Sequence, residues 1–344
     1  MRISVVIIPI LLSVMIVKQG LGSETPIRLG WQVPWATQGQ LVMGLQHTNI
    51  PQLNHLNIDY LGFAYGGPLN KAAIAGEVDI LLTADHPALV LMSKKPGYRI
   101  VSRMMYNRVC IYAPSKSTIS DLKQLEGKTV MGPIGAAAER VALQGLRDAS
   151  VNVDSLRIGK LDMAQQSALL SREGSESSWA GVDALFGFDP LPAVFQEQGK
   201  ARMLHCGKVV SVVVASPKML KRKDELKRFL QAFRMSWYYY ANNPQVVNQQ
   251  FSKQSRLNVS DAVLDEAASI EPNRWTTNPA EQSFVFKKGD LEILEEAQKY
   301  LLDRKILKAP LDISGQVDTA IMESLNETGS GTDRLSKIKA ISSN

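Results

Sequence analysis

Runs of consecutive apolar residues alternate along the chain with segments in which apolar residues recur every three or four positions. The first pattern is typical of buried strands and the second of helices that cover a sheet. The first predicted strands are 26–33, 56–63, 78–84 and 98–105, and the helices between them are 37–48, 67–77 and 86–95. This β-α-β order predicts an α/β protein with parallel strands and helices on both faces of the sheet.

A second series of the same kind follows. Its predicted strands are 108–114, 128–133, 155–161, 182–188, 201–207 and 208–217, and its predicted helices are 119–127, 136–149, 162–172 and 192–199. Helical spacing then dominates over 218–241, 244–253, 260–270 and 288–305. The pattern predicts two α/β units with a helical C-terminal third, and residues 326–344 are expected to form a flexible tail.

The N-terminus carries an apolar segment between two basic residues. Arg2 precedes "ISVVIIPILLSVMIV" and Lys18 follows it. This segment is short for a membrane span and has the length of a secretory signal core. Residues 1–23 are therefore predicted to be a signal peptide cleaved near Gly22 or Ser23, and an uncleaved membrane anchor is the alternative. In both cases the protein is expected to work outside the cytoplasm.

Length and composition fit two domains of ordinary size. The chain has 344 residues, of which 45% are apolar and 21% are charged, which is enough for proper cores. The net charge of +6 is scattered, and the densest basic cluster, "KMLKRKDELKR" at 218–228, alternates with acids at helical spacing. That pattern is typical of a solvated helix face, so no nucleic-acid partner is expected.

The familiar catalytic and metal-binding motifs are missing. Cys110 and Cys206 either pair, as an exported protein allows, or remain two separate buried thiols. The four scattered histidines show no zinc-ligand spacing. Gly127-Lys128-Thr129 lacks the earlier glycine of a phosphate-binding loop, because Leu122 stands there. No catalytic residue, metal or cofactor is therefore expected.

The residues that follow the strands are the candidates for ligand binding, because open parallel sheets bind ligands beyond the carboxyl ends of their strands. Four strand ends, expected to converge on one crevice, supply these candidates: Gln32, Pro34 and Trp35; Asp85 and His86; Gly135 and Ala136; Phe188 and Asp189. Trp35 fits either a ligand wall or a half-buried core aromatic. Asp85 fits a helix cap, a site carboxylate, or both.

The charges around the predicted crevice suggest a ligand class. The turn at Gly135 and Ala136 opens a helix, and free amides there suit a carboxylate, sulfonate or phosphonate head group. Glu139, in the first turn, favours the helix dipole but would repel a bare anion. Asp85 and Asp189 add further carboxylates, so acceptors outnumber cationic donors. This balance favours a ligand with amine or other N–H groups, including a zwitterion.

The apolar run "DALFGF" ends abruptly at Asp189-Pro190. Proline has no amide hydrogen, so a central strand cannot continue through it. Asp189 is predicted to face the crevice and contact the ligand, and a purely structural Asp-Pro turn is the alternative.

Taken together, several segments resemble one family, the substrate-binding proteins of ABC importers for nitrate, sulfonates and taurine. The segments are "IRLGWQVPWA", "AAIAGEVDILLTADHPAL", "ISDLKQLEGKTVMGPIGAAAERVAL" and "VDALFGFDPLPAVFQEQG". The resemblance covers nearly all of residues 25–310. It implies a two-lobed type II periplasmic binding protein, each lobe a mixed, mostly parallel sheet flanked by helices, with the ligand cleft between the lobes.

The resemblance also implies a domain division and a function. Lobe one would comprise 24–106 plus 210–325, and lobe two 107–209. The protein would be a periplasmic monomer that delivers a small sulfonate- or taurine-like, nitrogen-containing ligand to an ABC permease in the inner membrane. The nine strand-end residues would contact the ligand. The alternatives are a ligand-binding subunit of a sensor or receptor, and an enzyme like the pyrimidine synthases of thiamine biosynthesis.

Overall fold

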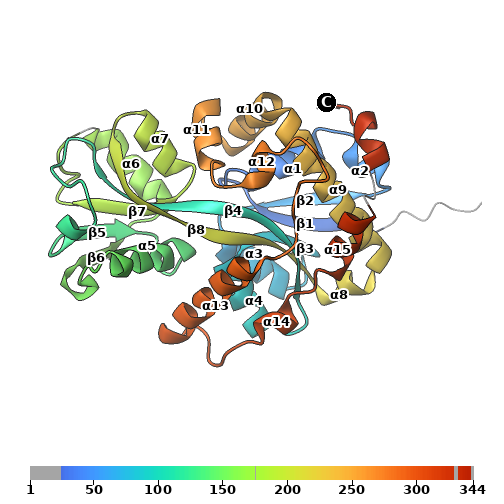
Figure 1. Ribbon diagram of the computed structural model, residues 1–344, viewed down its shortest axis with the longest axis horizontal. Helices are drawn as coiled ribbons and strands as arrows, with labels where there is room; N and C mark the ends of the chain where they lie inside the picture. Colours follow the sequence, from blue (N-terminus) through green and yellow to red (C-terminus); the bar gives the residue numbers. More distant parts are fainter. Residues whose placement is uncertain (1–24, 175, 329–331, 342–344) are drawn as a thin grey trace, which may run out of the picture.

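The computed structural model describes residues 25–174, 176–328 and 332–341, so the predicted signal peptide lies outside the described residues. Eight strands form one hydrogen-bonded sheet in the order β2-β1-β3-β8-β4-β7-β5-β6 (Figure 1). The strands are β1 Ile27–Gln32, β2 Ile58–Phe63, β3 Ile80–Ala84, β4 Arg99–Pro114, β5 Thr129–Gly132, β6 Arg157–Lys160, β7 Ala184–Phe188 and β8 Ala201–Ala215.

The two long strands β4 and β8 pair antiparallel along almost their whole length and join the two ends of the sheet. The sequence pattern divided each of them into two strands, and this prediction was wrong. The first division fell beside Asn107, a polar residue inside an apolar run. Asn107 is buried, and its side-chain oxygen accepts a hydrogen bond from the Ser211 hydroxyl of β8. A partnered amide can stay inside a strand, because its polar group is not left unsatisfied.

We call β2, β1 and β3 the β1 side of the sheet, and β7, β5 and β6 the β7 side. Within each side the neighbouring strands are parallel. β3 pairs antiparallel with β8, and β7 pairs antiparallel with β4. The strands of the two sides therefore run in opposite directions, and their carboxyl ends point toward each other across the middle of β4 and β8.

Helices cover both faces, as the pattern predicts (Figure 1). On the two sides of the sheet these are α1 Gln38–Gln46, α2 Ile50–Leu53, α3 Gly66–Ile74, α4 Asp85–Lys94, α5 Ala137–Asp148, α6 Met163–Glu173 and α7 Leu191–Glu197. The C-terminal third adds α8 Pro217–Lys221, α9 Lys223–Asn242, α10 Pro244–Ser255, α11 Asp261–Ala267, α12 Pro272–Trp275, α13 Lys288–Asp303, α14 Ile313–Gln316 and α15 Ala320–Glu327. Three short 3₁₀ helices complete the list: η1 Lys123–Leu125, η2 Val153–Ser155 and η3 Thr332–Lys337.

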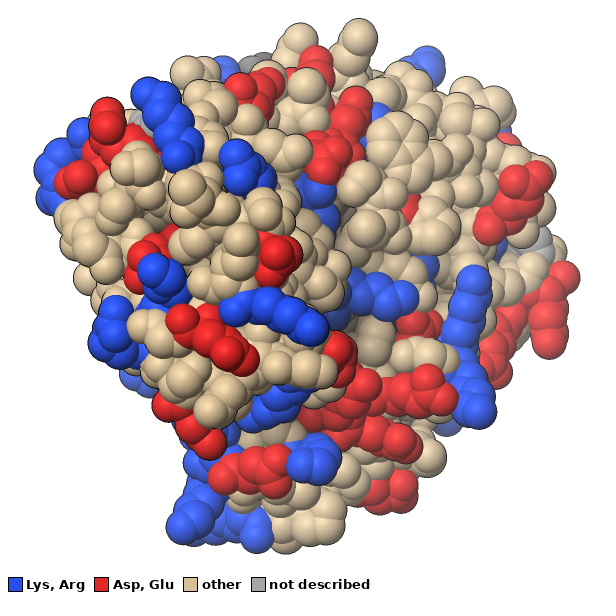
Figure 2. Space-filling view, turned by 60° about the vertical axis from the view of Figure 1, so that its left-hand side comes forward, with Lys and Arg blue, Asp and Glu red and all other residues tan. Residues whose placement is uncertain are grey.

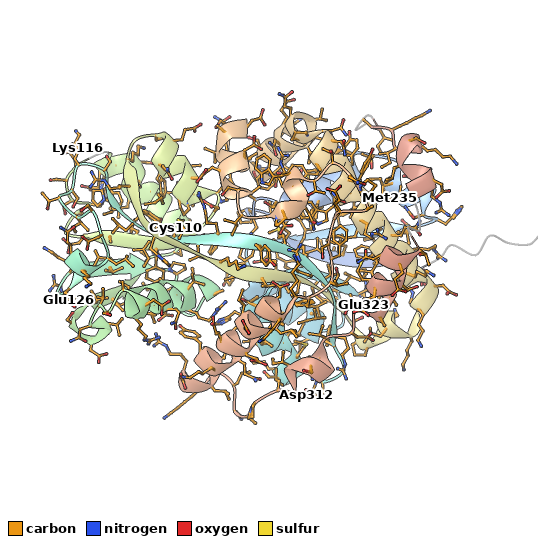
Figure 3. All side chains as sticks on the ribbon, viewed as in Figure 1. Cys110, Lys116, Glu126, Met235, Asp312 and Glu323 are labelled. Carbon is orange, nitrogen blue, oxygen red and sulfur yellow. A yellow bond between two sulfur atoms is a disulfide. The ribbon has the colours of Figure 1, made fainter. Side chains whose placement is uncertain are left out.

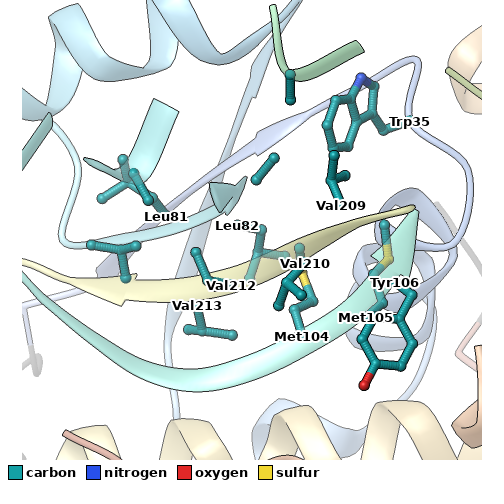
Figure 4. Packing of buried hydrophobic residues seen from close by; sticks show 14 of the residues in the cluster. Trp35, Leu81, Leu82, Met104, Met105, Tyr106, Val209, Val210, Val212 and Val213 are labelled. Atoms are coloured by element: carbon teal, nitrogen blue, oxygen red, sulfur yellow. The ribbon is translucent and has the colours of Figure 1, made fainter. Parts of the chain in front are cut away.

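Two apolar clusters form the interior. The larger one contains the apolar residues of β1, β3, β4 and β8 with those of α9, and it continues to α5 on the β7 side. Figure 4 shows part of it, where Val210, Val212 and Val213 of β8 pack beside Met104 and Met105 of β4. The smaller cluster lies within the β7 side, around Tyr112, Trp179 and Phe195. The larger cluster is therefore continuous across the junction of the two sides, and the smaller one is confined to the β7 side.

The C-terminal residues return to the β1 side. Residues 332–341 lie within the predicted flexible tail, yet they are hydrogen-bonded to the segment around α2. Thr48 forms a β-bridge with Ala340, and the Asn49 amide donates to the Lys339 carbonyl. Arg334 donates to the Leu53 carbonyl at 2.9 Å. This part of the chain is packed where a free tail was expected, because the carbonyls and amides that follow α1 give it partners.

Cys110 and Cys206 form a disulfide, one of the two arrangements that the sequence left open. They face each other on β4 and β8, with their Cα atoms 4.1 Å apart. Figure 3 places Cys110 where β4 enters the β7 side. The bond therefore links the two joining strands directly beside the junction of the two sides.

We expect loss of this disulfide to destabilise the fold without changing its topology. The bond closes a segment with a sequence separation of 96, and removing a native disulfide typically costs about 2–5 kcal/mol. The double variant Cys110→Ser, Cys206→Ser should show this loss in the free energy of unfolding measured by urea denaturation. Wild-type protein denatured with a reductant should match the variant. An unchanged urea midpoint in both samples would contradict the expectation.

Candidate functional site

All nine predicted site residues stand at or directly after the carboxyl ends of β1, β3, β5 and β7. The last residue of β3, Ala84, lies opposite Ser211, which in turn pairs with Met105 of β4. The last residue of β7, Phe188, lies opposite Val109 of the same strand. The two strand ends therefore meet from opposite directions within a short stretch of β4, where a ligand site of an open sheet is expected.

Contacts between side chains link these strand ends in pairs. The rings of Trp35 and Phe188 lie with their centroids 5.0 Å apart, which joins the end of β1 to the end of β7. The Gln32 amide nitrogen lies 3.5 Å from the Thr83 hydroxyl and joins β1 to β3. Asp85 pairs with Arg140 of α5, which joins the end of β3 to the segment after β5. The structure thus brings together the four regions that the sequence singled out.

Two side-chain N–H groups between the end of β1 and the start of α1 have no partner in the part of the chain that the structure describes. Gln38 accepts a hydrogen bond from the Gln32 amide at 2.6 Å through its side-chain oxygen, which leaves its side-chain nitrogen buried and without a partner. The indole nitrogen of Trp35 is likewise buried and unpartnered. Figure 4 shows this nitrogen on the edge of the ring that points away from Val209 and the core. Pro34, which precedes Trp35, is partly buried.

Asp85 is fully buried at the start of α4. One carboxylate oxygen accepts a hydrogen bond from an Arg140 guanidinium nitrogen at 2.6 Å, and the other accepts from the His86 amide at 2.6 Å. Arg140 is 5% exposed, and its Nε has no partner among the described residues. Asp85 therefore neutralises and orients Arg140, and leaves one guanidinium N–H free for a ligand.

His86 packs its ring against Tyr300 of α13, with the centroids 6.0 Å apart. Its Nδ1 is buried without a partner. Burial lowers the pKa of His86 below 6.5, and the positive charge of Arg140 acts in the same direction. The carboxylates of Asp85 and Glu139 oppose this shift but do not reverse it. The imidazole is therefore neutral near pH 7.

The turn that was predicted to seat an anion is already occupied by the chain. Gly135 adopts φ +80 and is exposed, and Ala136 precedes α5. The Gly135 amide donates to a carboxylate oxygen of Glu139 at 2.7 Å. The other Glu139 oxygen pairs with Arg304, which follows α13. A ligand anion would have to displace or adjoin this carboxylate.

Asp189 is 3% exposed, and both of its oxygens have partners within the protein. One oxygen lies 2.6 Å from Nε of Arg108, and the other accepts from the Ala193 amide of α7 at 3.1 Å. Burial raises the pKa of Asp189 above its ordinary value, and Arg108 and the Ala193 amide offset part of this rise. Asp189 therefore caps α7 and pairs with Arg108, as the structural alternative required. Its contact with a ligand remains a prediction.

The cations of the site were missed from the sequence. Arg108 lies inside β4 and also pairs with Glu266 of α11. Arg140 lies on the second turn of α5, and Arg304 follows α13. None of them follows a strand directly, so an inspection of strand ends alone passes over them. The signal that could have found Arg108 is a charged residue that opens the apolar run "RVCIYAP".

These contacts change the expected charge balance. The carboxylates that seemed available to a ligand amine, Asp85, Glu139 and Asp189, are each paired with an arginine. Three of the buried polar atoms left unpartnered here are N–H donors, on Trp35, Gln38 and Arg140. Such donors fit an oxyanion head group. A buried acceptor, the side-chain oxygen of Asn70, is also unpartnered, and Asn70 donates to the Pro87 carbonyl of α4.

Comparison with known protein families adds to this geometry. The profile described as NMT1/THI5 like matches residues 64–246. The chain belongs to the NMT1/THI5-like family. No curated protein matches the sequence.

Solved structures similar to this NMT1/THI5-like protein include sulfonate-binding proteins. The alkanesulfonate-binding protein SsuA from Xanthomonas axonopodis pv. citri, bound to MOPS, has a TM-score of 0.66 at 16% identity, over 85% of this chain and 97% of that one. The periplasmic sulfonate-binding protein SsuA from Methylobacillus flagellatus KT has a TM-score of 0.71 at 14% identity, over 90% and 96%. At these identities the likeness shows the fold, and it confirms the predicted type II periplasmic binding protein class.

The same fold also occurs in an enzyme. The desulfurization enzyme DszB has a TM-score of 0.62 at 15% identity, over 88% of this chain and 99% of that one. Within the described part of this NMT1/THI5-like protein, no group of three or more His, Cys, Asp or Glu residues is placed to hold a metal ion. Its described helices are all too short or too polar to span a bilayer.

We expect Asp189→Asn to reduce stability strongly. The change leaves Arg108 with Glu266 as its remaining ion-pair partner, so we expect a loss near the lower end of the about 3–5 kcal/mol that removal of one partner from a buried ion pair costs. Urea unfolding measures the loss. Asp303→Asn is the matched control, because Asp303 pairs with Lys299 on the surface, with 64% of its side chain exposed, and such pairs contribute about 0–1 kcal/mol. Equal effects of the two substitutions would show that Asp189 has no special structural role.

Acidification should destabilise the protein partly through His86. At pH values between the lowered pKa of folded His86 and 6.5, the unfolded chain binds a proton on this histidine and the folded protein does not. Stability therefore falls as the pH falls. Between pH 7.5 and 5.5, the wild type should lose more stability than His86→Gln, by up to about 1.4 kcal/mol. Urea unfolding at the two pH values tests this difference. His55→Asn, at an exposed position, should behave like the wild type, and equal losses in all three proteins would refute the assignment.

Proposed function

We propose that this protein is an extracytoplasmic solute-binding protein that delivers a small sulfonate-like organic anion to an ABC importer. The observation that carries the proposal is that, among the described residues, the segments after β1 and β5 hold three buried N–H donors without partners, on Trp35, Gln38 and Arg140. A head group with several acceptor oxygens would satisfy these donors together, and each buried donor left unpaired is costly. The sulfonate-binding neighbours of the same fold support this ligand class.

The proposed mechanism uses the division into lobes. We assign 24–106 plus 210–325 to lobe one and 107–209 to lobe two, with the boundaries inside β4 and β8. The ligand would bind donors of lobe one, Trp35 and Gln38, and Arg140 of lobe two at once. It would therefore stabilise the closed arrangement, which an inner-membrane permease recognises. We propose that the protein acts as a periplasmic monomer.

The aromatic contact between Trp35 and Phe188 supplies an apolar wall beside the donors. This wall suits the organic part of a ligand, so it favours an organic anion over nitrate or sulfate. The nearby carboxylates are paired with arginines, so they are engaged within the protein and do not serve a ligand amine. The Asn70 oxygen is the group that could accept from a neutral N–H of the ligand.

We propose binding rather than catalysis. Among the described residues both cysteines are consumed by the disulfide, so neither offers a thiol nucleophile. Asp85, the buried carboxylate beside Arg140 and His86, already accepts from the Arg140 guanidinium and from the His86 amide, so it is engaged and does not serve as a base. This arrangement serves to hold charge, not to move a proton.

The proposal is tested by calorimetric titration and thermal shift with alkanesulfonates, taurine, nitrate and pyrimidines. A ligand at 100–1,000 times its dissociation constant should raise the free energy of unfolding by about 3–4 kcal/mol. Arg140→Lys keeps a cation beside Asp85 but removes the planar N–H fork, and it should weaken sulfonate binding at least tenfold. Arg157→Lys, on the exposed edge strand β6, is the control. No shift with any sulfonate in ligand-stripped protein would overturn the proposal.

A further inference from the structure

Glu139 is an unusual carboxylate because it is buried and occupies the amide turn that opens α5. It is 2% exposed, and one of its oxygens accepts from the Gly135 amide at 2.7 Å. A free turn of this kind attracts external anions, since its amides and the helix dipole both favour negative charge. Here the chain supplies that negative charge itself.

The residue that follows α13 holds this carboxylate in place, and a tyrosine of the same helix lies near it. Arg304 forms an ion pair with its second oxygen. Tyr300 lies one turn earlier. Burial raises the pKa of its hydroxyl above the ordinary value, and the nearby Glu139 carboxylate raises it further. α13 contacts both α4 and α5, so Glu139 is held by an element from outside its own helix.

Glu139 and Arg140 are consecutive residues, and the charges of both act on the buried His86 ring. Arg140 is the next residue, is 95% buried, and has an unpartnered Nε. Its positive charge is already shared with Asp85 at 2.6 Å and, more distantly, with Glu296 at 3.8 Å. A ligand anion at Arg140 therefore approaches a region where carboxylates already balance the guanidinium, and each additional negative charge on the ligand raises the repulsion.

We propose that Glu139 is a specificity-determining residue, a resident carboxylate that lets the site accept a head group with one negative charge and reject one with two. This inference rests on the proposed function and deepens it. A sulfonate carries a single charge, whereas an alkylphosphonate above its second pKa carries two on a head group of the same tetrahedral shape. Shape and hydrogen-bond acceptors hardly distinguish the two ligands, but the charge of Glu139 does.

The test compares 1-propanesulfonate with 1-propylphosphonate at pH 8.5 by calorimetric titration. The wild type should bind the sulfonate at least tenfold more tightly. Glu139→Gln keeps the side-chain length and an acceptor for the Gly135 amide but removes the negative charge. It should reduce the ratio of sulfonate to phosphonate affinity at least fivefold. Glu296→Gln is the matched control, because it removes a carboxylate near the same arginine whose side chain is 61% exposed. It should change the preference less than twofold.

Arg304→Gln should change the sulfonate preference in the direction opposite to Glu139→Gln. Its side chain is 47% exposed, so the variant should fold, and loss of the cation should widen the preference for the sulfonate. If Glu139→Gln does not fold, this variant decides the question, and an unchanged preference overturns the proposal. An unchanged preference in a folded Glu139→Gln overturns it equally. A wild type that binds neither these probes nor any other sulfonate would refute the proposed function itself, and the role of Glu139 with it.

Discussion

The antiparallel pairing of β4 with β8 is the constraint on which the rest of the structure depends. These strands run from one side of the sheet to the other, and every other strand is placed by hydrogen bonds to them directly or through a neighbour. Because β3 and β7 join this ladder from opposite directions, their carboxyl ends meet near Met105 and Val109. The site therefore follows from strand direction before any side chain is considered.

Buried charges then fix the residues around that meeting point. Each carboxylate is matched by an arginine from a different element, as in the pairs Asp85 with Arg140 and Asp189 with Arg108. Such pairs are geometrically demanding, since a buried ion is stable only when its partner and its hydrogen bonds are in place. On the surface, Figure 2 shows acidic side chains beside Lys and Arg side chains over much of the face in view, with a group of acidic side chains gathered below its centre.

The sequence predicted the succession of elements and the strand ends well, because buried runs and helical spacing depend on local residues. It predicted poorly which buried residues form ion pairs and hydrogen bonds with one another. Asp189 and Glu139 were visible as carboxylates, but Arg108 and Arg304 reach them from distant parts of the chain, and such pairing depends on the tertiary fold. The sequence also failed to predict that β4 is continuous, because the hydroxyl that hydrogen-bonds to the Asn107 side chain lies on β8. The strand end before Pro190 marked Asp189 as a candidate site residue, whereas its bonds to Arg108 and Ala193 depend on the tertiary fold.

The contact between Trp35 and Phe188 has a spectroscopic consequence. Trp31, Trp179 and Trp237 are enclosed in the interior and Trp275 is half exposed, whereas Trp35 meets a ring from the other side of the junction. A change in the angle between the two proposed lobes would alter the surroundings of that indole. The intrinsic fluorescence of the protein would therefore report such a motion without labels and in real time.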